Sequence, residues 1–297
     1  MTQLSDNTRG ALLMMAGMTA FSFGDVMVKA TAGQMPLGQI LSLRGALSSM
    51  AIYLIARHLG ALTLRLSRRD WGLVTLRSLA EVGSAYFFLT ALFEMPLANI
   101  NALLQMLPLT VTLGSALVFR EYVGWRRWVA IAIGFVGMLL IVKPGTEGFN
   151  AYTVYALIAV LCVTVRDLVT RRFSKEVPSL TITLITALSV TLFALCLSLQ
   201  EQWVPLTPWL GGLVVLAALC VVVGYILSIM VMRVGDVSFI APFRYTGLLW
   251  ALVLGLVLFG EWPRPLTLLG AAIIVATGVF TLLREAQLRR ARLRAAG

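Results

Sequence analysis

Apolar residues fill ten long segments of the chain, and short polar or turn-forming stretches separate them. A helix of about 18 apolar residues or more is long enough to cross a bilayer, and only the segment at 125–142 is marginal. The pattern predicts an all-α polytopic membrane protein, because a helix leaves no backbone polar group unpaired in lipid. The ten predicted helices cover residues 10–30, 36–56, 71–93, 97–118, 125–142, 151–170, 180–199, 208–232, 237–259 and 265–283.

The composition supports a lipid bilayer as the surroundings of the chain. Hydrophobic residues make up 59% of it and charged residues 12%, which is more apolar side chain than a soluble domain can bury. The net charge of +11 does not indicate a nucleic-acid partner, because no basic stripe alternates with exposed aromatic residues. Cys162, Cys196 and Cys220 stand singly in apolar runs, so the sequence predicts no metal site and no cofactor.

The basic residues predict the orientation. If both termini are cytoplasmic, the outer loops contain only Lys143 and Arg264, as expected for a bacterial inner (plasma) membrane protein. Five further basic residues, Lys29, Arg44, Arg77, Arg166 and Arg244, fall inside predicted helices. The cytoplasmic segments then hold Arg9, Arg57, Arg65, Arg68, Arg69, Arg120, Arg126, Arg127, Arg171, Arg172, Lys175, Arg233 and the arginines of a basic tail at 284–297.

The two halves of the chain resemble one another. Phe119-Arg120-Glu121 closes one apolar run, and Phe259-Gly260-Glu261 closes another 140 positions later. Each motif precedes a tryptophan-containing turn and a glycine-bearing helix, and Glu121 and Glu261 are expected to cap helix junctions. With five helices in each half, the second copy enters the membrane from the opposite side, which is a common transporter construction. We therefore expect a single integral domain made of inverted repeats at 10–142 and 151–283.

Short motifs follow one another along nearly the whole chain. They are Gly24-Asp25-Val26-Met27-Val28-Lys29, Leu43-Arg44-Gly45, Pro108, Phe119-Arg120-Glu121, Trp125-Arg126-Arg127-Trp128, Gly134-Phe135-Val136-Gly137, Lys143-Pro144-Gly145, Arg166-Asp167, Thr170-Arg171-Arg172, Ala241-Pro242-Phe243-Arg244-Tyr245 and Phe259-Gly260-Glu261. In this order they resemble the EamA family of drug/metabolite transporters, and among its branches the one that includes S-adenosylmethionine uptake carriers. The resemblance implies ten helices in two inverted five-helix halves. It does not fix the substrate, and the Arg77 and Glu81 pair matches no binding role known in the family.

Charged side chains inside the predicted helices are the main candidates for a substrate site. Each costs at least about 2.5–3.5 kcal/mol near the bilayer centre, so it is expected to face a cavity or a partner. Asp25 and Lys29 are four residues apart and share a helix face, where they can pair. Arg44, at a similar depth, can pair with Asp25 or offer its planar guanidinium to a substrate carboxylate.

Glu81 has two interpretations. It can form an internal salt bridge with Arg77, four residues earlier, or act as a titratable carboxylate whose proton is coupled to transport. Arg166 and Asp167 are adjacent and are expected to point in different directions. Arg166 then lies near the interface, and Asp167 is the better candidate for a cavity.

Arg244 is the leading candidate, and Tyr245 accompanies it. Pro242 precedes both and can bend the helix, which frees a backbone carbonyl for a ligand. Arg244 has no charged neighbour three or four positions away, so its partner comes from another helix or from the substrate. The remaining candidates are Asn101 and Gln105, which share a helix face, and the aromatic residues Tyr86 and Trp250, which can stack on a planar ligand or simply pack.

These features favour a secondary transporter that works by alternating access. No GxxxxGK[ST] motif occurs, so the sequence has no ATPase signature, and no HExxH or GxSxG motif indicates an enzyme. A mixture of acidic and basic groups suits a zwitterionic, amino-acid-like or S-adenosylmethionine-like substrate. The alternatives are a carrier of a vitamin such as riboflavin, an exporter of amino acids or drugs, and a membrane sensor or assembly factor without flux. A homodimer is compatible with the sequence.

Overall fold

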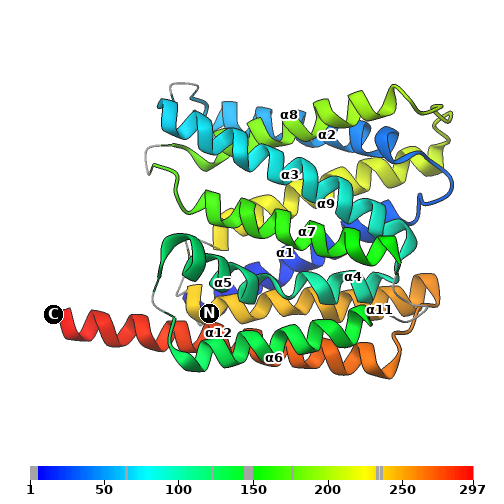
Figure 1. The fold of residues 1–297 in the computed structure, drawn as a ribbon. Helices are drawn as coiled ribbons and strands as arrows, with labels where there is room; N and C mark the ends of the chain where they lie inside the picture. Colours follow the sequence, from blue (N-terminus) through cyan, green and yellow to red (C-terminus); the bar gives the residue numbers. More distant parts are fainter. Residues whose placement is uncertain are drawn as a thin grey trace, which may run out of the picture. The chain divides into compact units, whose positions relative to one another are not determined.

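The computed structural model describes residues 6–63, 66–121, 123–143, 150–174, 177–231, 234 and 237–296. All regular structure within these ranges is helical, which confirms the predicted all-α class (Figure 1). Among the features named above, Arg65, Pro144-Gly145, Lys175 and Arg233 lie outside the described residues.

Each of the ten predicted segments is helical along most of its described length. Eight of them are single helices, and two are interrupted. The single helices are α1 (Asp6–Lys29), α2 (Leu37–His58), α3 (Arg68–Glu94), α6 (Trp125–Val142), α7 (Ala151–Thr170), α8 (Ser179–Ser198), α9 (Pro208–Val231) and α12 (Pro265–Ala296).

Both interruptions occur at prolines. The predicted helix 97–118 consists of α4 (Leu97–Leu104) and α5 (Leu107–Phe119), with Pro108 in the first turn of α5. The predicted helix 237–259 consists of α10 (Val237–Ile240), the 3₁₀ turn η1 (Ala241–Tyr245) and α11 (Thr246–Phe259), with Pro242 in the first turn of η1. Proline has no N–H to donate and its ring clashes with the carbonyl four residues earlier, so a new helical segment starts at each of these sites.

Nine helical segments in the described part of the chain are long and apolar enough to cross a membrane. The predicted helix 71–93 corresponds to α3, which has 27 residues but is not among the nine. Arg77 and Glu81 lie within its apolar sequence, so α3 is the helix in which polar chemistry most interrupts the hydrophobic pattern.

The chain divides into two compact units. Unit 1 comprises Met1–Ser22, Met95–Thr153 and Val223–Gly297, and unit 2 comprises Phe23–Glu94 and Val154–Val222. The helices α2, α3 and α8, and α7 from Val154 onward, therefore belong to unit 2, whereas α4, α5, α6, α11 and α12 belong to unit 1. The boundary passes through α1 and α9, so each of these helices contributes to both units.

In unit 2, α2 and α8 lie side by side (Figure 1), and the start of α2 is held by residues that follow α8. The Glu201 carboxylate accepts hydrogen bonds from the backbone N–H groups of Gly38 at 3.0 Å and Gln39 at 3.1 Å. The side chain of Gln39 donates to the Val204 carbonyl at 2.8 Å and accepts from the Val204 N–H at 3.0 Å. A carboxylate is favourable here, because the first N–H groups of a helix have no partner within the helix.

The start of α8 is fixed in a corresponding way by residues that follow α2. The Thr181 hydroxyl accepts a hydrogen bond from the Thr63 N–H at 3.2 Å and donates to the Ala61 carbonyl at 2.8 Å. Each helix of the pair thus begins beside the loop that follows its partner. The two helices are consequently antiparallel.

In unit 1, α6 and α12 cross closely at a pair of glycines. A Cβ atom on Gly137 would meet the Gly270 carbonyl oxygen at 2.9 Å, and a Cβ atom on Gly270 would meet the Gly137 carbonyl oxygen at 2.5 Å. Neither position has room for a Cβ atom beside the backbone of the other helix. Such small residues allow membrane helices to approach each other, and here the close approach is reciprocal.

A glutamate fixes the start of the broken helix α4. Glu261 follows the left-handed residue Gly260 that ends α11, and its carboxylate accepts a hydrogen bond from the Leu97 N–H at 2.8 Å. Arg120 ends α5 in the same left-handed conformation, which is uncommon for a residue with a side chain. The structure confirms the predicted capping role for Glu261.

Candidate functional site

Three of the predicted charged residues form one cluster in unit 2. Glu81 projects from α3, and Arg166 and Asp167 project from α7. A guanidinium nitrogen of Arg166 lies 3.5 Å from the Glu81 carboxylate and another lies 2.9 Å from Oδ1 of Asp167. The expectation that Arg166 and Asp167 point in different directions is wrong, because the long arginine side chain folds back and bonds its neighbour. Arg166 therefore bridges two carboxylates from adjacent helices.

Arg77 lies one turn before Glu81 on α3, and neutral groups engage its guanidinium. It donates hydrogen bonds to the Thr170 hydroxyl on α7 at 3.0 Å and to the Thr186 hydroxyl on α8 at 2.8 Å. These contacts tie three helices of unit 2 together. They give Arg77 a structural task that the sequence, which offered only Glu81 as its partner, did not reveal.

Lys29 and Asp25 occupy the part of α1 that belongs to unit 2. Lys29 is 7% exposed, and its ammonium group donates a hydrogen bond to the Leu92 carbonyl at 3.2 Å. Leu92 lies in the last turn of α3, where carbonyls lack helical partners and a positive charge is favourable. Arg44 on α2 is close enough to Asp25 for its charge to act on the carboxylate, in agreement with their expected similar depth.

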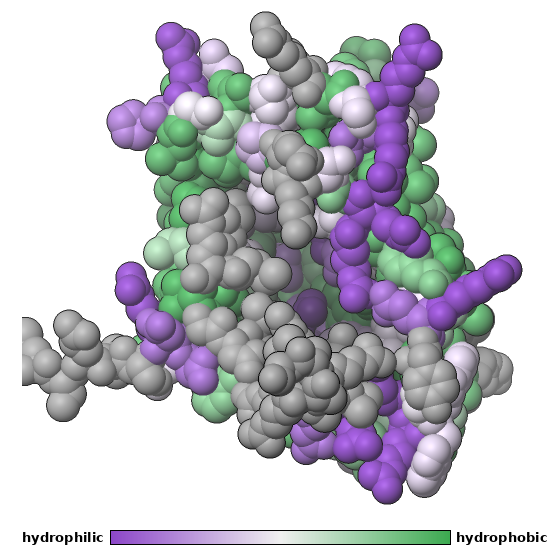
Figure 2. Space-filling model, turned by 90° about the vertical axis from the view of Figure 1, so that its left-hand side faces the viewer, coloured by the Kyte–Doolittle hydropathy of each residue, from purple (hydrophilic) through white to green (hydrophobic). Residues whose placement is uncertain are grey.

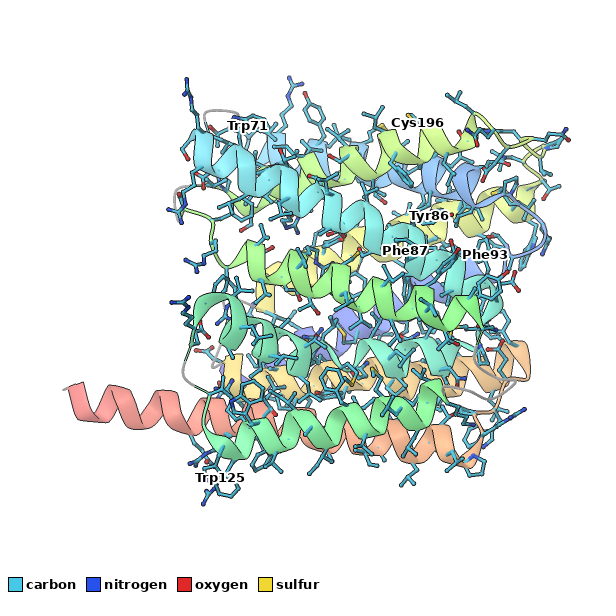
Figure 3. All side chains as sticks on the ribbon, in the orientation of Figure 1. Trp71, Tyr86, Phe87, Phe93, Trp125 and Cys196 are labelled. Carbon is cyan, nitrogen blue, oxygen red and sulfur yellow. The ribbon has the colours of Figure 1, made fainter. Side chains whose placement is uncertain are left out.

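The aromatic candidate Tyr86 packs with other rings of unit 2. Its ring makes edge contacts with Phe87 on the same helix and with Phe193 on α8, at centroid distances of 5.3 and 5.9 Å. Figure 3 shows Tyr86 and Phe87 near one another on α3. Tyr86 is thus part of an aromatic cluster. Trp250, the other aromatic candidate, is half-buried on α11 of unit 1.

In unit 1, the interruption between α4 and α5 carries the two polar candidates of that segment. Asn101 donates a hydrogen bond from its side chain to the Leu97 carbonyl at 3.0 Å, one turn earlier. Gln105 ends α4 and is 7% exposed. Because Pro108 has no N–H, the Leu104 carbonyl has no helical partner four residues ahead. The break thus places the Gln105 carboxamide beside a carbonyl that lacks its usual helical donor, within a candidate membrane span.

The second interruption of unit 1, the turn η1, contains Arg244 and Tyr245. Among the described residues, the half-buried Arg244 has no hydrogen bond or ion pair, and its charge acts on the neighbouring Tyr245. Tyr245 is 7% exposed, and its hydroxyl has no hydrogen-bond partner in the described part of the chain. Burying an unpaired hydroxyl costs about 1–3 kcal/mol, so this turn holds two polar groups with unused binding capacity.

Gly278 on α12 makes room for Tyr245. A Cβ atom at Gly278 would collide with the Tyr245 hydroxyl and would lie 2.8 Å from the ring carbon that bears it. The phenol therefore lies directly against the backbone of α12. The sequence signalled Gly278 only as one glycine of a glycine-bearing helix, and nothing in the chain pattern linked it to Tyr245.

A serine and an aspartate organise the start of α3, outside the predicted span 71–93. Asp70 accepts a hydrogen bond from the Ser67 hydroxyl at 2.6 Å, and Ser67 accepts one from the Asp70 N–H at 3.0 Å. The Ser174 hydroxyl, in the turn after α7, donates to the same carboxylate at 3.1 Å. The Ser67 hydrogen bond, more than any other contact, lowers the pKa of the Asp70 carboxyl below its usual value.

Comparison with known proteins places the chain among transporters. The model of the EamA-like transporter family matches it twice, at residues 8–143 and 151–283. The riboflavin transporter of Vibrio cholerae is 31% identical to it, across 78% of this chain and 79% of that protein. The S-adenosylmethionine uptake transporter of Rickettsia prowazekii is 23% identical and covers 93% of both chains.

Two further comparisons also cover most of this chain. The pseudopaline exporter of Pseudomonas aeruginosa is 26% identical, across 90% of this chain and 93% of that protein. A solved crystal structure superposes with a TM-score of 0.65 over 94% of this chain and 99% of the other, at 21% identity, which shows a common fold. The family resemblance read from the motifs is confirmed.

Proposed function

The chain belongs to the EamA-like transporter family, and from this we propose that it is a secondary transporter that moves a small zwitterionic metabolite across the bacterial inner membrane by alternating access. The nine candidate membrane spans of the described residues and the bacterial transporter relatives support a multi-pass inner membrane transporter of small molecules, without naming the substrate. The proposed substrate is amino-acid-like or S-adenosylmethionine-like. The Rickettsia relative is named for uptake of S-adenosylmethionine, which bears both a carboxylate and cationic groups.

The proposed architecture is a ten-helix inverted repeat with both termini in the cytoplasm. The double match of the family model supports two repeats at 10–142 and 151–283. So do the reciprocal contacts in unit 2, where α2 and α8 each begin beside the loop that follows the other. The excess of arginine in the inner loops supports the orientation.

The substrate proposal rests on the surroundings of Arg244, which offer its charge no ion pair among the described residues. It lies half-buried in the break of a membrane-spanning segment and has no ion pair with any described residue. A guanidinium at that depth needs a compensating negative charge, and its planar fork matches the two oxygens of a carboxylate. We assign the substrate carboxylate to Arg244, with Tyr245 as a neighbouring donor and Gln105, Asn101 and Trp250 as further candidates of unit 1.

The acidic groups of unit 2 are proposed for cations. Asp25, Glu81 and Asp167 can each interact with a cationic group or a proton, while Arg44, Lys29 and Tyr86 remain secondary candidates. Glu81 is the proposed proton-coupling residue, because its carboxylate lies inside the predicted span 71–93 and faces the Arg166 guanidinium at 3.5 Å, whose charge can stabilise the ionised form after the proton leaves.

A specific observation favours a second substrate class. The Vibrio relative, at 31% identity, is named as a riboflavin transporter, so a planar vitamin that stacks on aromatic residues is the alternative cargo. The half-buried Trp250 and the Tyr86 cluster are the candidates for such stacking.

Two measurements test the proposed function. A thermal-shift screen of purified protein against amino acids, S-adenosylmethionine and riboflavin identifies the ligand class, and we expect stabilisation by a zwitterion. Flux of the best ligand is then measured in proteoliposomes with and without a pH gradient. Binding without flux would indicate a sensor or assembly factor, and turnover of a lipid by the purified protein would indicate an enzyme.

A further inference from the structure

The two interrupted segments of unit 1 come to the same depth beside α12. A Cβ atom at Gly134 on α6 would collide with the Leu109 side chain of α5 and would lie 3.1 Å from the Thr277 hydroxyl of α12. The next residue of α12 is Gly278, which lies against the Tyr245 hydroxyl of η1. The start of α5 and the end of η1 therefore approach adjacent residues of one helix.

The packing of α4 against α11 gives the same register. The two helices lie side by side (Figure 1), and a Cβ atom at Gly255, near the end of α11, would lie 3.7 Å from the Leu97 side chain at the start of α4. They are thus antiparallel. Eight residues further along α4, about 12 Å deeper, is Gln105. Eight residues back along α11 is Gly247, which follows Tyr245 by two positions. The break between α4 and α5, at 105–106, is therefore level with η1.

Both interruptions lie inside candidate membrane spans. Gln105 belongs to the span Leu97–Phe119, and Arg244 belongs to the span Ala241–Phe259. Figure 2, which faces the end of unit 1 where α6 begins, shows hydrophilic residues at this end, where water can satisfy them. Polar groups within a span have no such solvent, so they cost free energy unless a partner or a ligand satisfies them.

Gln105 carries polar groups that the fold does not use. The residue is 7% exposed, and its carboxamide makes no hydrogen bond with any described residue. The Leu109 N–H, which in a continuous helix would bond the Gln105 carbonyl, bonds the Met106 carbonyl at 2.9 Å instead. Gln39 in unit 2 is buried as well, but both ends of its carboxamide bond the backbone of Val204. In the described part of the chain, Gln105 thus keeps a side-chain oxygen and a backbone oxygen without a donor.

These oxygens have the chemistry of a cation site. Gln105 follows the last turn of α4, and the final carbonyls of a helix carry a partial negative charge. Unwound carbonyls at the ends of broken membrane helices coordinate cations in transporters of other folds. An ammonium group has three donors and no acceptor, so oxygens without donors can satisfy it. The guanidinium of Arg244, at the same depth, suits an anion instead.

We propose that the break between α4 and α5 binds the ammonium group of the substrate while Arg244 binds its carboxylate, so that unit 1 recognises an α-amino acid by both of its charged groups. This inference rests on the proposed function, in which Arg244 receives the carboxylate. It makes Gln105 the residue that distinguishes an amino acid from a simple carboxylate. The acidic groups of unit 2 are then left for a proton or for a further cationic group.

The test compares two ligands that differ only at the proposed group. L-Methionine carries the ammonium and the carboxylate, whereas 4-(methylthio)butanoate has the same chain and carboxylate without the ammonium. Binding of each ligand to the full chain in detergent is measured by titration calorimetry. We expect Gln105→Leu to bind methionine about 10- to 150-fold more weakly than the wild type does, with an unchanged affinity for the butanoate. Arg244→Ala should weaken the binding of both ligands.

Two further variants separate recognition from folding. Gln39→Leu makes the same change at a buried glutamine whose carboxamide is already bonded, so it should lower the unfolding midpoint and leave the ratio of the two affinities unchanged. Gln105→Met keeps the length of the side chain without its oxygen, and it should lose the preference for methionine as Gln105→Leu does.

The outcomes distinguish this inference from the function on which it rests. If Gln105→Leu and Gln105→Met keep the wild-type preference for methionine, the ammonium assignment is wrong while the assignment of Arg244 stands. If the wild type binds neither ligand, both proposals fail. Stabilisation of the wild type by sodium chloride over choline chloride, lost in Gln105→Leu while methionine affinity is unchanged, would make the break an inorganic cation site and overturn the inference.

Discussion

The two units treat their buried charges differently. In unit 2, Arg166 bridges Glu81 and Asp167, Arg77 is held by two threonines, and Lys29 is held by a backbone carbonyl. In the η1 turn of unit 1, Arg244 has no ion pair and Tyr245 no hydrogen-bond partner among the described residues.

The difference distinguishes charges that hold helices together from charges kept for a ligand. A satisfied charge stabilises the packing, and removing it leaves its partners unpaired. A charge without a partner costs stability and is retained for some other benefit, which in a transporter is the binding of cargo. Variants in the two regions should therefore separate stability from transport.

The largest effect is expected from Arg244→Ala. Loss of a carboxylate partner should cost about 2–3 kcal/mol of binding, or roughly 30- to 150-fold in affinity, and should abolish uptake. Expression and thermal stability should remain, because no described residue depends on Arg244. The contrasting variant is Arg77→Ala, which should lower the unfolding midpoint while substrate affinity stays near wild type. Normal uptake by Arg244→Ala would remove Arg244 from the site.

The next effect concerns the contact that positions the η1 turn. Gly278→Ala introduces a methyl group into the space occupied by the Tyr245 hydroxyl, and we expect a loss of about 1–3 kcal/mol in stability. The double variant Gly278→Ala/Tyr245→Phe removes the colliding oxygen and should recover part of that loss. Thermal unfolding of the four proteins measures the coupling, and strict additivity would show that the two residues do not touch in solution.

Tyr245→Phe alone separates stability from substrate binding, because it removes only an oxygen that has no hydrogen-bond partner among the described residues. Its stability should equal or slightly exceed that of the wild type, whereas substrate affinity should fall if the hydroxyl serves the cargo.

The helices could be predicted from the sequence, because lipid imposes one length and one polarity on every span. The breaks in the fourth and ninth segments were visible only as Pro108 and Pro242. The sequence could not show that Pro108 separates two helices, whereas Pro242 begins a 3₁₀ turn. Those outcomes depend on the local packing of each segment.

The candidate charges could be predicted from the sequence, because a charged residue stands out in an apolar run. The partners of these charges could not be predicted. The bond between Arg166 and Asp167 and the threonine partners of Arg77 depend on side-chain conformation and on the packing of α7 and α8. Helical spacing alone suggests partners only within the same helix, so contacts such as that between Gln39 and Val204 have no signal in the pattern.

A smaller effect is expected from Glu81→Gln in unit 2. If Glu81 carries the coupled proton, a gradient of one pH unit drives at most about tenfold accumulation, and the variant should lose that tenfold. Exchange of labelled for unlabelled substrate should continue, since it needs no net proton movement. Asp70→Asn is the control, because Asp70 is an acidic residue of the same helix that lies outside the predicted span 71–93. Accumulation by Glu81→Gln that still follows the pH gradient would exclude Glu81 as the coupling residue.

The smallest effect is expected at the start of α3, where the charge of Asp70 is satisfied outside the membrane. Its pKa is lowered in the folded protein, so its ionised form stabilises the fold above the pKa of the unfolded chain, near 3.9. That contribution is lost as the pH falls through the lower, folded pKa. The unfolding midpoint of the wild type should therefore decline below about pH 4 more steeply than that of Asp70→Asn, which lacks the titrating group. Ser67→Ala should fall between the two, because it removes the hydrogen bond that contributes most to the shift and leaves the Ser174 contact in place. Parallel pH profiles for all three proteins would mean that the Asp70 carboxylate does not depend on its neighbours. The contrast between satisfied and unsatisfied charges would then lose its clearest example outside the predicted spans.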